Sequence, residues 1–156
     1  MGSAAEDPAD DPPVALTSTL VPATPPTARA APALLAEARR IRSPSMSASM
    51  SGESLINHAA IISGASGLEP ATAAELSVLK ELGLPVRNAG TYIGHGVDAQ
   101  FAANIGIASA ALEHGKLFVP AGSGDTGESP PALSQILVTS VGNWRGEGLA
   151  LITRAQ

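Results

Sequence analysis

The feature that most limits what this chain can fold into is an uncharged segment of small residues. From residue 99 to residue 112 the sequence reads AQFAANIGIASAAL, with no charged side chain. A helix that is apolar on nearly all sides is typical of a protein interior. We therefore expect a buried helix from Asp98 to His114, with Asp98 as its capping residue. Four of its apolar residues recur at helical spacing: Phe101, Ile105, Ala108 and Leu112.

The segments on either side alternate between short apolar runs and a second helical pattern. The pattern at 70–82 predicts a helix, and Thr72 and Glu75 form a capping box at its start. The order strand, helix, strand, helix, strand, hairpin predicts an α/β fold with a mixed sheet. Strands are predicted at 59–63, 84–87 and 116–120, and a terminal antiparallel hairpin at 136–141 and 149–153.

Proline usage divides the chain into two parts. Eight of the thirteen prolines lie in the first fifty residues, which otherwise consist mainly of alanine, serine and threonine. Proline interrupts hydrogen-bonded ladders, so residues 1–54 are expected to be a disordered segment. Residues 55–156 are expected to form the ordered domain.

Charge and composition exclude several classes of function. The net charge is −5 and no basic patch occurs, which argues against a nucleic-acid partner. The chain has no cysteine, and its three histidines are scattered without an acidic pair at ligand spacing, so no metal or other cofactor is expected. No apolar run approaches the roughly 20 residues of a membrane span, and acidic residues occupy the position of a signal peptide's positive region. A soluble cytoplasmic protein is therefore expected.

His95 is the candidate for chemistry because it lies between two glycines at a junction of loop and helix. The glycine-rich turn at 63–67 matches neither the phosphate-binding loop nor the dinucleotide fingerprint. A histidine at a helix entry can also have a purely structural role. The residues around His95 leave both interpretations open.

Four motifs, taken in order, resemble the C-terminal half of the β-ketoacyl-acyl carrier protein synthases, which have the thiolase fold. They are SGASG at 63–67, GTYIGH at 90–95, ALEHGKLFVP at 111–120 and TSVGNWRGEGLALI at 139–152. The resemblance covers roughly residues 55–155. It implies a partial thiolase-like layer and a role in fatty-acid or polyketide biosynthesis.

In that family a cysteine thiolate takes the acyl chain, and two histidines stabilise the enolate oxygen formed when malonyl carrier protein loses CO2. A lysine supports the second histidine. The resemblance makes His95 the second histidine and therefore the catalytic candidate. It places Gly64 at the first histidine and Gly90 at the lysine, and the cysteine has no counterpart. Asn143 falls near the gating phenylalanine of the closing loop, so Asn143 and its neighbour Trp144 are the candidates for binding substrate or acyl carrier protein.

Three hypotheses follow from this resemblance. The chain is an incomplete or divergent acyltransferase of the ketosynthase type that does not condense acyl chains alone. Alternatively, it is a non-catalytic subunit that binds an active synthase, an acyl carrier protein or a second copy of itself. The third hypothesis is a truncated gene product without an independent function.

Overall fold

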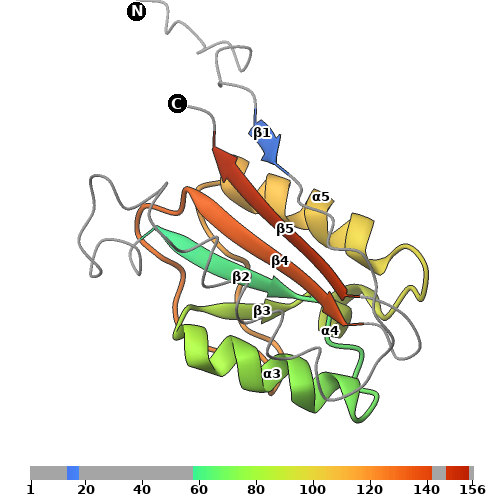
Figure 1. Ribbon diagram of the computed structural model, residues 1–156. Coiled ribbons are helices and arrows are strands. Elements are labelled where there is room, and N and C mark those ends of the chain that lie inside the picture. The colour runs from blue at the N-terminus through green and yellow to red at the C-terminus, as the bar shows by residue number, and fades with distance from the viewer. Residues whose placement is uncertain (1–13, 18–57, 142–146, 155–156) are drawn as a thin grey trace, which may run out of the picture.

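The computed structural model of the protein describes residues 14–17, 58–141 and 147–154 (Figure 1). Its strands form one five-stranded sheet in the order β1-β5-β4-β2-β3. The strands are β1 (Val14–Thr17), β2 (Ala59–Ser63), β3 (Val86–Asn88), β4 (Gln135–Val141) and β5 (Glu147–Arg154). The helices of the described part are α3 (Ala71–Leu82), α4 (Gly90–Ile93) and α5 (Gln100–Glu113).

The sheet is mixed, as expected from the sequence. β2 runs parallel to both β3 and β4. β5 is antiparallel to β4, with a register from Gln135 opposite Thr153 to Val141 opposite Glu147. The predicted terminal hairpin is therefore confirmed, with both strands longer than the apolar runs that indicated them.

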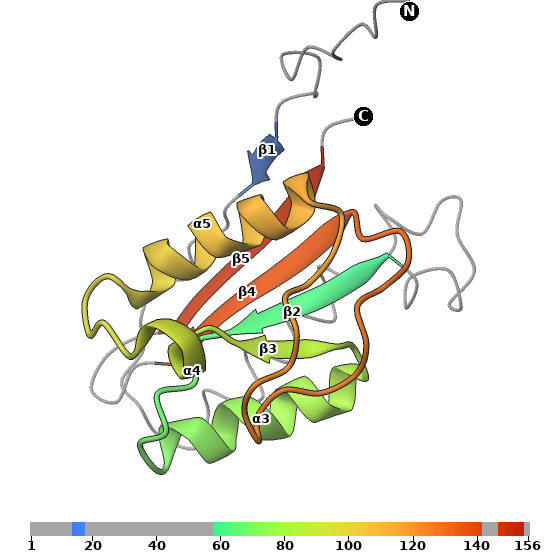
Figure 2. The same cartoon turned by 180° about the vertical axis from the view of Figure 1, so that it is seen from behind.

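The helices cover opposite faces of the sheet, so the fold has three layers. Figures 1 and 2 show α5 along one face and α3 along the other. Successive residues of a strand point to opposite faces, so Ile62 packs with Leu112 of α5 while Ile61 packs with Leu79 of α3. All five residues of β2 are buried, which explains why four consecutive apolar residues precede Ser63.

One predicted strand is wrong, and one short helix was not predicted. Residues 116–120 do not form a strand, and the short helix α4 was not expected. Leu117 and Phe118 are apolar enough for a strand, but side chains satisfy their backbone groups. The Leu117 N–H donates to Ser129 Oγ at 2.8 Å, and the Phe118 carbonyl accepts from Arg87 Nε at 2.7 Å. The segment therefore needs no neighbouring strand.

The N-terminal segment also differs from expectation at one place. Residues 14–17 lie within the part expected to be disordered, yet they form β1, which pairs antiparallel with β5 from Val14 opposite Arg154 to Thr17 opposite Leu151. The expected short helix at 33–41 lies outside the described residues. A four-residue strand among prolines has too little pattern to be read from sequence, because its partner lies more than a hundred positions away.

Neither predicted helix cap forms. Pro70 occupies the N-cap position of α3, and the hydroxyl of Thr72 is buried with no hydrogen-bond partner among the residues that the structure describes. Ala99 occupies the N-cap position of α5, with no side-chain cap. The capping box fails because Glu75 points into the protein, where it meets β2 and β4.

The second helix is also less enclosed than its composition indicated. α5 buries Ala108 and Leu112 against the sheet, but Ala102, Gly106 and Ala110 on its outer side are exposed. None of the helices in the described ranges has both the length and the hydropathy of a membrane span.

Candidate functional site

The carboxyl ends of β2 and β3 lie at the same edge of the sheet because the two strands are parallel. We call the two segments at this edge, residues 64–70 and 89–99, the carboxyl edge; the second contains α4. Asn88 joins them, because its Nδ2 donates to the Ala65 carbonyl at 3.1 Å. Both glycines of interest, Gly64 and Gly90, and His95 belong to this edge.

A carboxyl group is enclosed directly beneath the carboxyl edge. The side chain of Glu75 is only 1% exposed. Its Oε1 accepts hydrogen bonds from Ser63 Oγ at 2.8 Å, from Thr139 Oγ1 at 2.5 Å and from the Gly64 N–H at 3.2 Å. Its Oε2 has no partner among the described residues. Burial raises the pKa of Glu75 above 4.5, although the bonds from Thr139, Ser63 and Gly64 act in the opposite direction.

A chain of amide side chains connects the other face of β2 to the residue after His95. Asn104 Nδ2 donates to the Ser63 carbonyl at 3.3 Å, and its Oδ1 accepts from Gln100 Nε2 at 2.8 Å. Gln100 Oε1 in turn accepts from the Gly96 N–H at 2.8 Å. Both amide side chains are buried. Ser63 therefore belongs to two polar networks, one on each side of the sheet.

These buried polar residues were not identified from the sequence. The available signal was spacing: Gln100 and Asn104 are four positions apart and share a helix face with Ala108. Polar residues within an apolar stripe indicate a buried network. Glu75 gave a misleading signal, because its position three after Thr72 fitted a capping box.

The predicted catalytic residue, His95, lies on the carboxyl edge and is exposed. Its side chain makes no hydrogen bond and no ion pair with any residue that the structure describes. Asn143 and Trp144, the predicted substrate-binding residues, lie outside the described residues. Whether the three predicted site residues lie close together therefore stays a prediction.

The two glycines that stand where the family has a histidine and a lysine differ in their surroundings. A Cβ at Gly64 would lie 2.7 Å from the Thr139 carbonyl oxygen and 3.0 Å from Ser140 Cα. A Cβ at Gly90 would lie 3.2 Å from Asn88 Oδ1, a side-chain atom. Backbone atoms of β4 therefore leave no room for a side chain at Gly64, whereas the nearest atom to a Cβ at Gly90 belongs to a side chain that can move.

Asp125 stabilises the carboxyl edge, although it lies outside the two segments that define this edge. Its Oδ1 accepts from the Asn88 N–H at 2.7 Å, and its Oδ2 accepts from the N–H groups of Ala121 and Gly122 at 2.8 and 3.1 Å. The Tyr92 hydroxyl also donates to Oδ2, at 3.3 Å. Partial burial raises the pKa of Asp125, but the backbone donors outweigh it and hold the pKa below 3.8.

Replacing Asp125 with alanine is expected to lower the free energy of unfolding by about 1–2 kcal/mol, because three backbone donors lose their acceptor. The folded-state pKa is lowered, so the ionised carboxylate stabilises the fold above pH 3.8 and this contribution is lost as the pH falls through the folded value. Urea unfolding of both proteins, near neutral pH and below pH 3.8, measures this. The difference between them should shrink in acid. Glu128→Gln, a change at an exposed carboxylate, is the control, and an equal difference at both pH values would contradict the role of Asp125.

Arg87 is a second organising residue that the sequence did not reveal. The side chain is 1% exposed. Its Nη1 donates to the carbonyls of Val86, Thr126 and Gly127 at 2.9, 2.9 and 3.0 Å, and its Nε donates to that of Phe118. All these acceptors are backbone carbonyls, so the guanidinium holds the loop after α5 against the edge strand β3.

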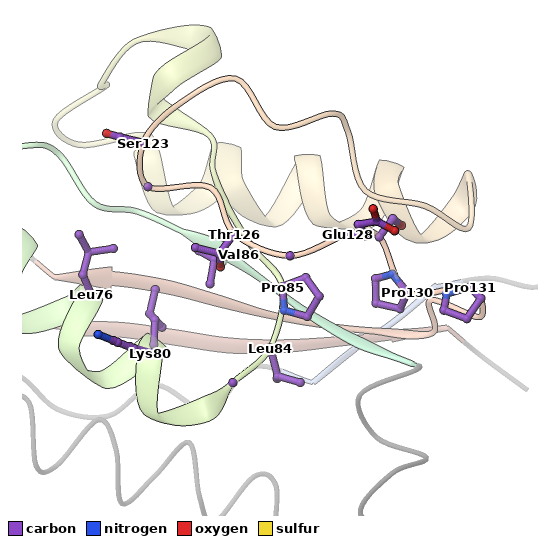
Figure 3. Close-up of a pocket in the computed structure, with 15 residues that line it drawn as sticks. Leu76, Lys80, Leu84, Pro85, Val86, Ser123, Thr126, Glu128, Pro130 and Pro131 are labelled. Carbon is purple, nitrogen blue, oxygen red and sulfur yellow. The ribbon is translucent and has the colours of Figure 1, made fainter.

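A cavity of about 760 Å³ lies between the C-terminal half of α3 and the loop at 123–131 (Figure 3). Leu76 and Lys80 line it from α3, and Pro130 and Pro131 line it from the loop. Glu75 and His95 are not among its lining residues. Lys80 and Glu128 are its charged residues, of opposite sign, so the cavity lacks the convergent polar groups that define a particular ligand.

The described residues contain no group of three or more His, Asp or Glu side chains that could hold a metal ion. No protein-family model, curated protein or solved structure matches this chain. The site is therefore interpreted from its own geometry. That geometry comprises a sealed carboxyl group, a histidine without partners among the described residues, and an exposed edge of the sheet.

Proposed function

We propose that this chain is a β-ketoacyl synthase-like cytoplasmic protein that does not catalyse condensation by itself and acts by binding an active synthase. An acyl carrier protein is the alternative partner. In this proposal the three layers formed by α3, the sheet and α5 correspond to one half of a thiolase-type fold. The pathway is fatty-acid or polyketide biosynthesis.

The observation that carries the non-catalytic part is the closed position at Gly64. A pair of preorganised donors is what an enolate oxygen needs. A side chain at Gly64 would collide with the backbone of β4, so the packing favours glycine there. His95 would act without this second donor, and it is exposed to water. A single histidine in water provides little stabilisation of a developing negative charge.

The binding part is supported by apolar side chains exposed at the carboxyl edge. Leu68 is 56% exposed and Ile93 is 58% exposed, and they lie on the two loops that Asn88 joins. Tyr92 precedes Ile93 in the chain, and its hydroxyl donates to the carbonyl of Val119, a further exposed apolar residue. Exposed apolar side chains at one edge of a protein are typical of an interface.

The first experiment incubates the purified chain with acyl and malonyl carrier proteins and measures the β-ketoacyl product. No product above background is expected, and robust condensation would contradict the proposal. Binding is then measured by calorimetry with a full-length synthase and, separately, with an acyl carrier protein.

We expect Ile93→Asp to weaken binding to the synthase by at least about tenfold, the usual scale for a central apolar contact. Ser77→Asp, on the exposed side of α3 and further from the carboxyl edge, is the control and should bind like the wild type. Binding to the carrier protein alone would identify the alternative partner. Equal affinity for both variants would exclude the carboxyl edge as the interface.

A further inference from the structure

The cavity beside α3 lies at the end of the sheet opposite to the carboxyl edge. Leu84 and Pro85, the two residues before β3, line it together with the C-terminal half of α3. Its volume of about 760 Å³ is within the range of about 300–1,000 Å³ that is usual for pockets that bind a ligand. The cavity therefore has room for an occupant and is separate from the site described above.

The walls of this cavity are mainly apolar. Leu76 lines it from α3, and Leu84 and Pro85 line it from the segment that enters β3. Its two charged residues, Lys80 and Glu128, come from opposite walls, and both are exposed (Figure 3). An apolar occupant therefore fits this cavity better than a charged one, because its side chains would leave water for the leucine and proline surfaces.

The start of β2 lies at the rim of the cavity. His58 Nδ1 donates to the Ala132 carbonyl at 2.8 Å, and Ala132 directly follows Pro131 of the cavity wall. Three residues further along, the Ile61 N–H donates at 2.8 Å to the carbonyl of Pro85, which lines the cavity beside β3. The chain therefore enters β2 next to two of the segments that form the cavity.

The residues directly before His58 have the composition that suits this cavity. Residues 54–57, which lie outside the described residues, are Ser-Leu-Ile-Asn, an uncharged segment with two large apolar side chains. One residue spans at most about 3.6 Å, so the backbone of Leu55 and Ile56 lies within about 11 Å of His58. The covalent chain therefore keeps both residues near the rim of the cavity.

We propose that the cavity beside α3 is the docking site of residues 54–57, with the side chains of Leu55 and Ile56 against its apolar walls. A link this short gives the segment a local concentration in the millimolar range, against which a free molecule or a second copy must compete. The contact joins the chain before β2 to α3 and to the loop before β4. It does not depend on the proposed function, because the carboxyl edge lies at the other end of β2 and β3.

The reactivity of an introduced thiol tests this docking, since the chain has no cysteine of its own. In the full chain with Ile56→Cys, the thiol should react with a soluble maleimide at least about tenfold more slowly than in urea, because the cavity excludes the reagent. Leu35→Cys, in the apolar run at 33–41, is the matched control and should react at similar rates with and without urea. Adding Leu55→Asp to Ile56→Cys should restore the fast reaction, because burial of a carboxylate is unfavourable.

A change in the cavity itself is the second arm of the experiment. Leu84→Asp, with its helix content checked by circular dichroism, should also restore the fast reaction of Ile56→Cys. An unchanged slow rate in this folded variant would mean that residues 54–57 bind elsewhere, which would overturn the proposal. Equal rates for Ile56→Cys and Leu35→Cys would overturn it as well. Protection of Leu35→Cys alone would make residues 33–41 the occupant, and protection of Ile56→Cys that disappears on dilution would make it a second copy; either result contradicts the proposed docking.

Discussion

Replacing Gly64 with alanine is expected to lower the free energy of unfolding by about 3 kcal/mol, the upper part of the range for an overpacked interior. The added Cβ would lie 2.7 Å from the Thr139 carbonyl oxygen, and that oxygen belongs to the backbone of β4. Backbone cannot rotate away as a side chain can. The end of β2 and the middle of β4 must therefore separate, which also disturbs the bonds to Glu75. Chemical denaturation with a two-state fit measures the loss.

Gly96→Ala is the matched control for this prediction, because it adds the same group at the same edge of the sheet. The nearest atom to a Cβ at Gly96 is the Gln100 amide nitrogen at 4.0 Å. Its stability should stay within about 0.5 kcal/mol of the wild type, as for most exposed substitutions. Gly64→His should be at least as unstable as Gly64→Ala and should show no condensing activity. A stable and active Gly64→His protein would contradict both the steric argument and the proposed function.

Replacing Glu75 with leucine is expected to lower the free energy of unfolding by about 3 kcal/mol, because several buried donors lose one acceptor. Those donors are the hydroxyls of Ser63 and Thr139 and the Gly64 N–H. Leucine has a similar volume but accepts no hydrogen bond. Glu75→Gln keeps an acceptor oxygen and should stay within about 1 kcal/mol of the wild type, as expected for a typical single hydrogen-bond change. Equal losses for the two variants would show that packing, and not hydrogen bonding, is the role of Glu75.

Glu75 also gives the protein a pH dependence with a definite sign. Its folded-state pKa is raised above 4.5, so the folded state holds the proton more tightly than the unfolded state. The resulting stabilisation is complete below pH 4.5 and is lost as the pH rises through the folded pKa. Glutamine does not titrate. The free energy of unfolding of Glu75→Gln, relative to that of the wild type, should therefore increase as the pH rises. Denaturation of both proteins across this range checks the sign, and a constant difference would contradict it.

Local patterns predicted the elements whose signal is local. The all-apolar run of β2 indicated a strand buried on both faces, and α3 on one side and α5 on the other explain why no alternation was needed. The apolar runs near the C-terminus indicated a hairpin, and its pairing is confirmed. The C-terminal end of α3 was also predicted correctly, since Gly83 adopts the left-handed conformation there.

The failures share a different cause, which is competition from partners distant in the chain. Thr72 and Glu75 have the spacing of a capping box, but Thr139, sixty-four positions after Glu75, takes the carboxylate into the interior. Residues 116–120 have the composition of a strand, but Ser129 and Arg87 satisfy their backbone groups first. His95 has the position of a presented histidine, but no described residue orients it. A local motif cannot indicate which distant group will compete for its hydrogen bonds.

Sequence patterns were enough to predict the α/β class, the position of most strands and helices, and the uncharged stretch at 99–112. These properties depend on periodicity and composition, which are local. Three other features depend on the folded structure: Glu75 is sealed beneath the carboxyl edge, Gly64 has no room for a side chain, and no described residue covers Ala102, Gly106 and Ala110 of α5. Each of these features depends on how closely two segments that are distant in the sequence approach each other. Whether the gap between them admits one more methyl group cannot be predicted from either segment alone.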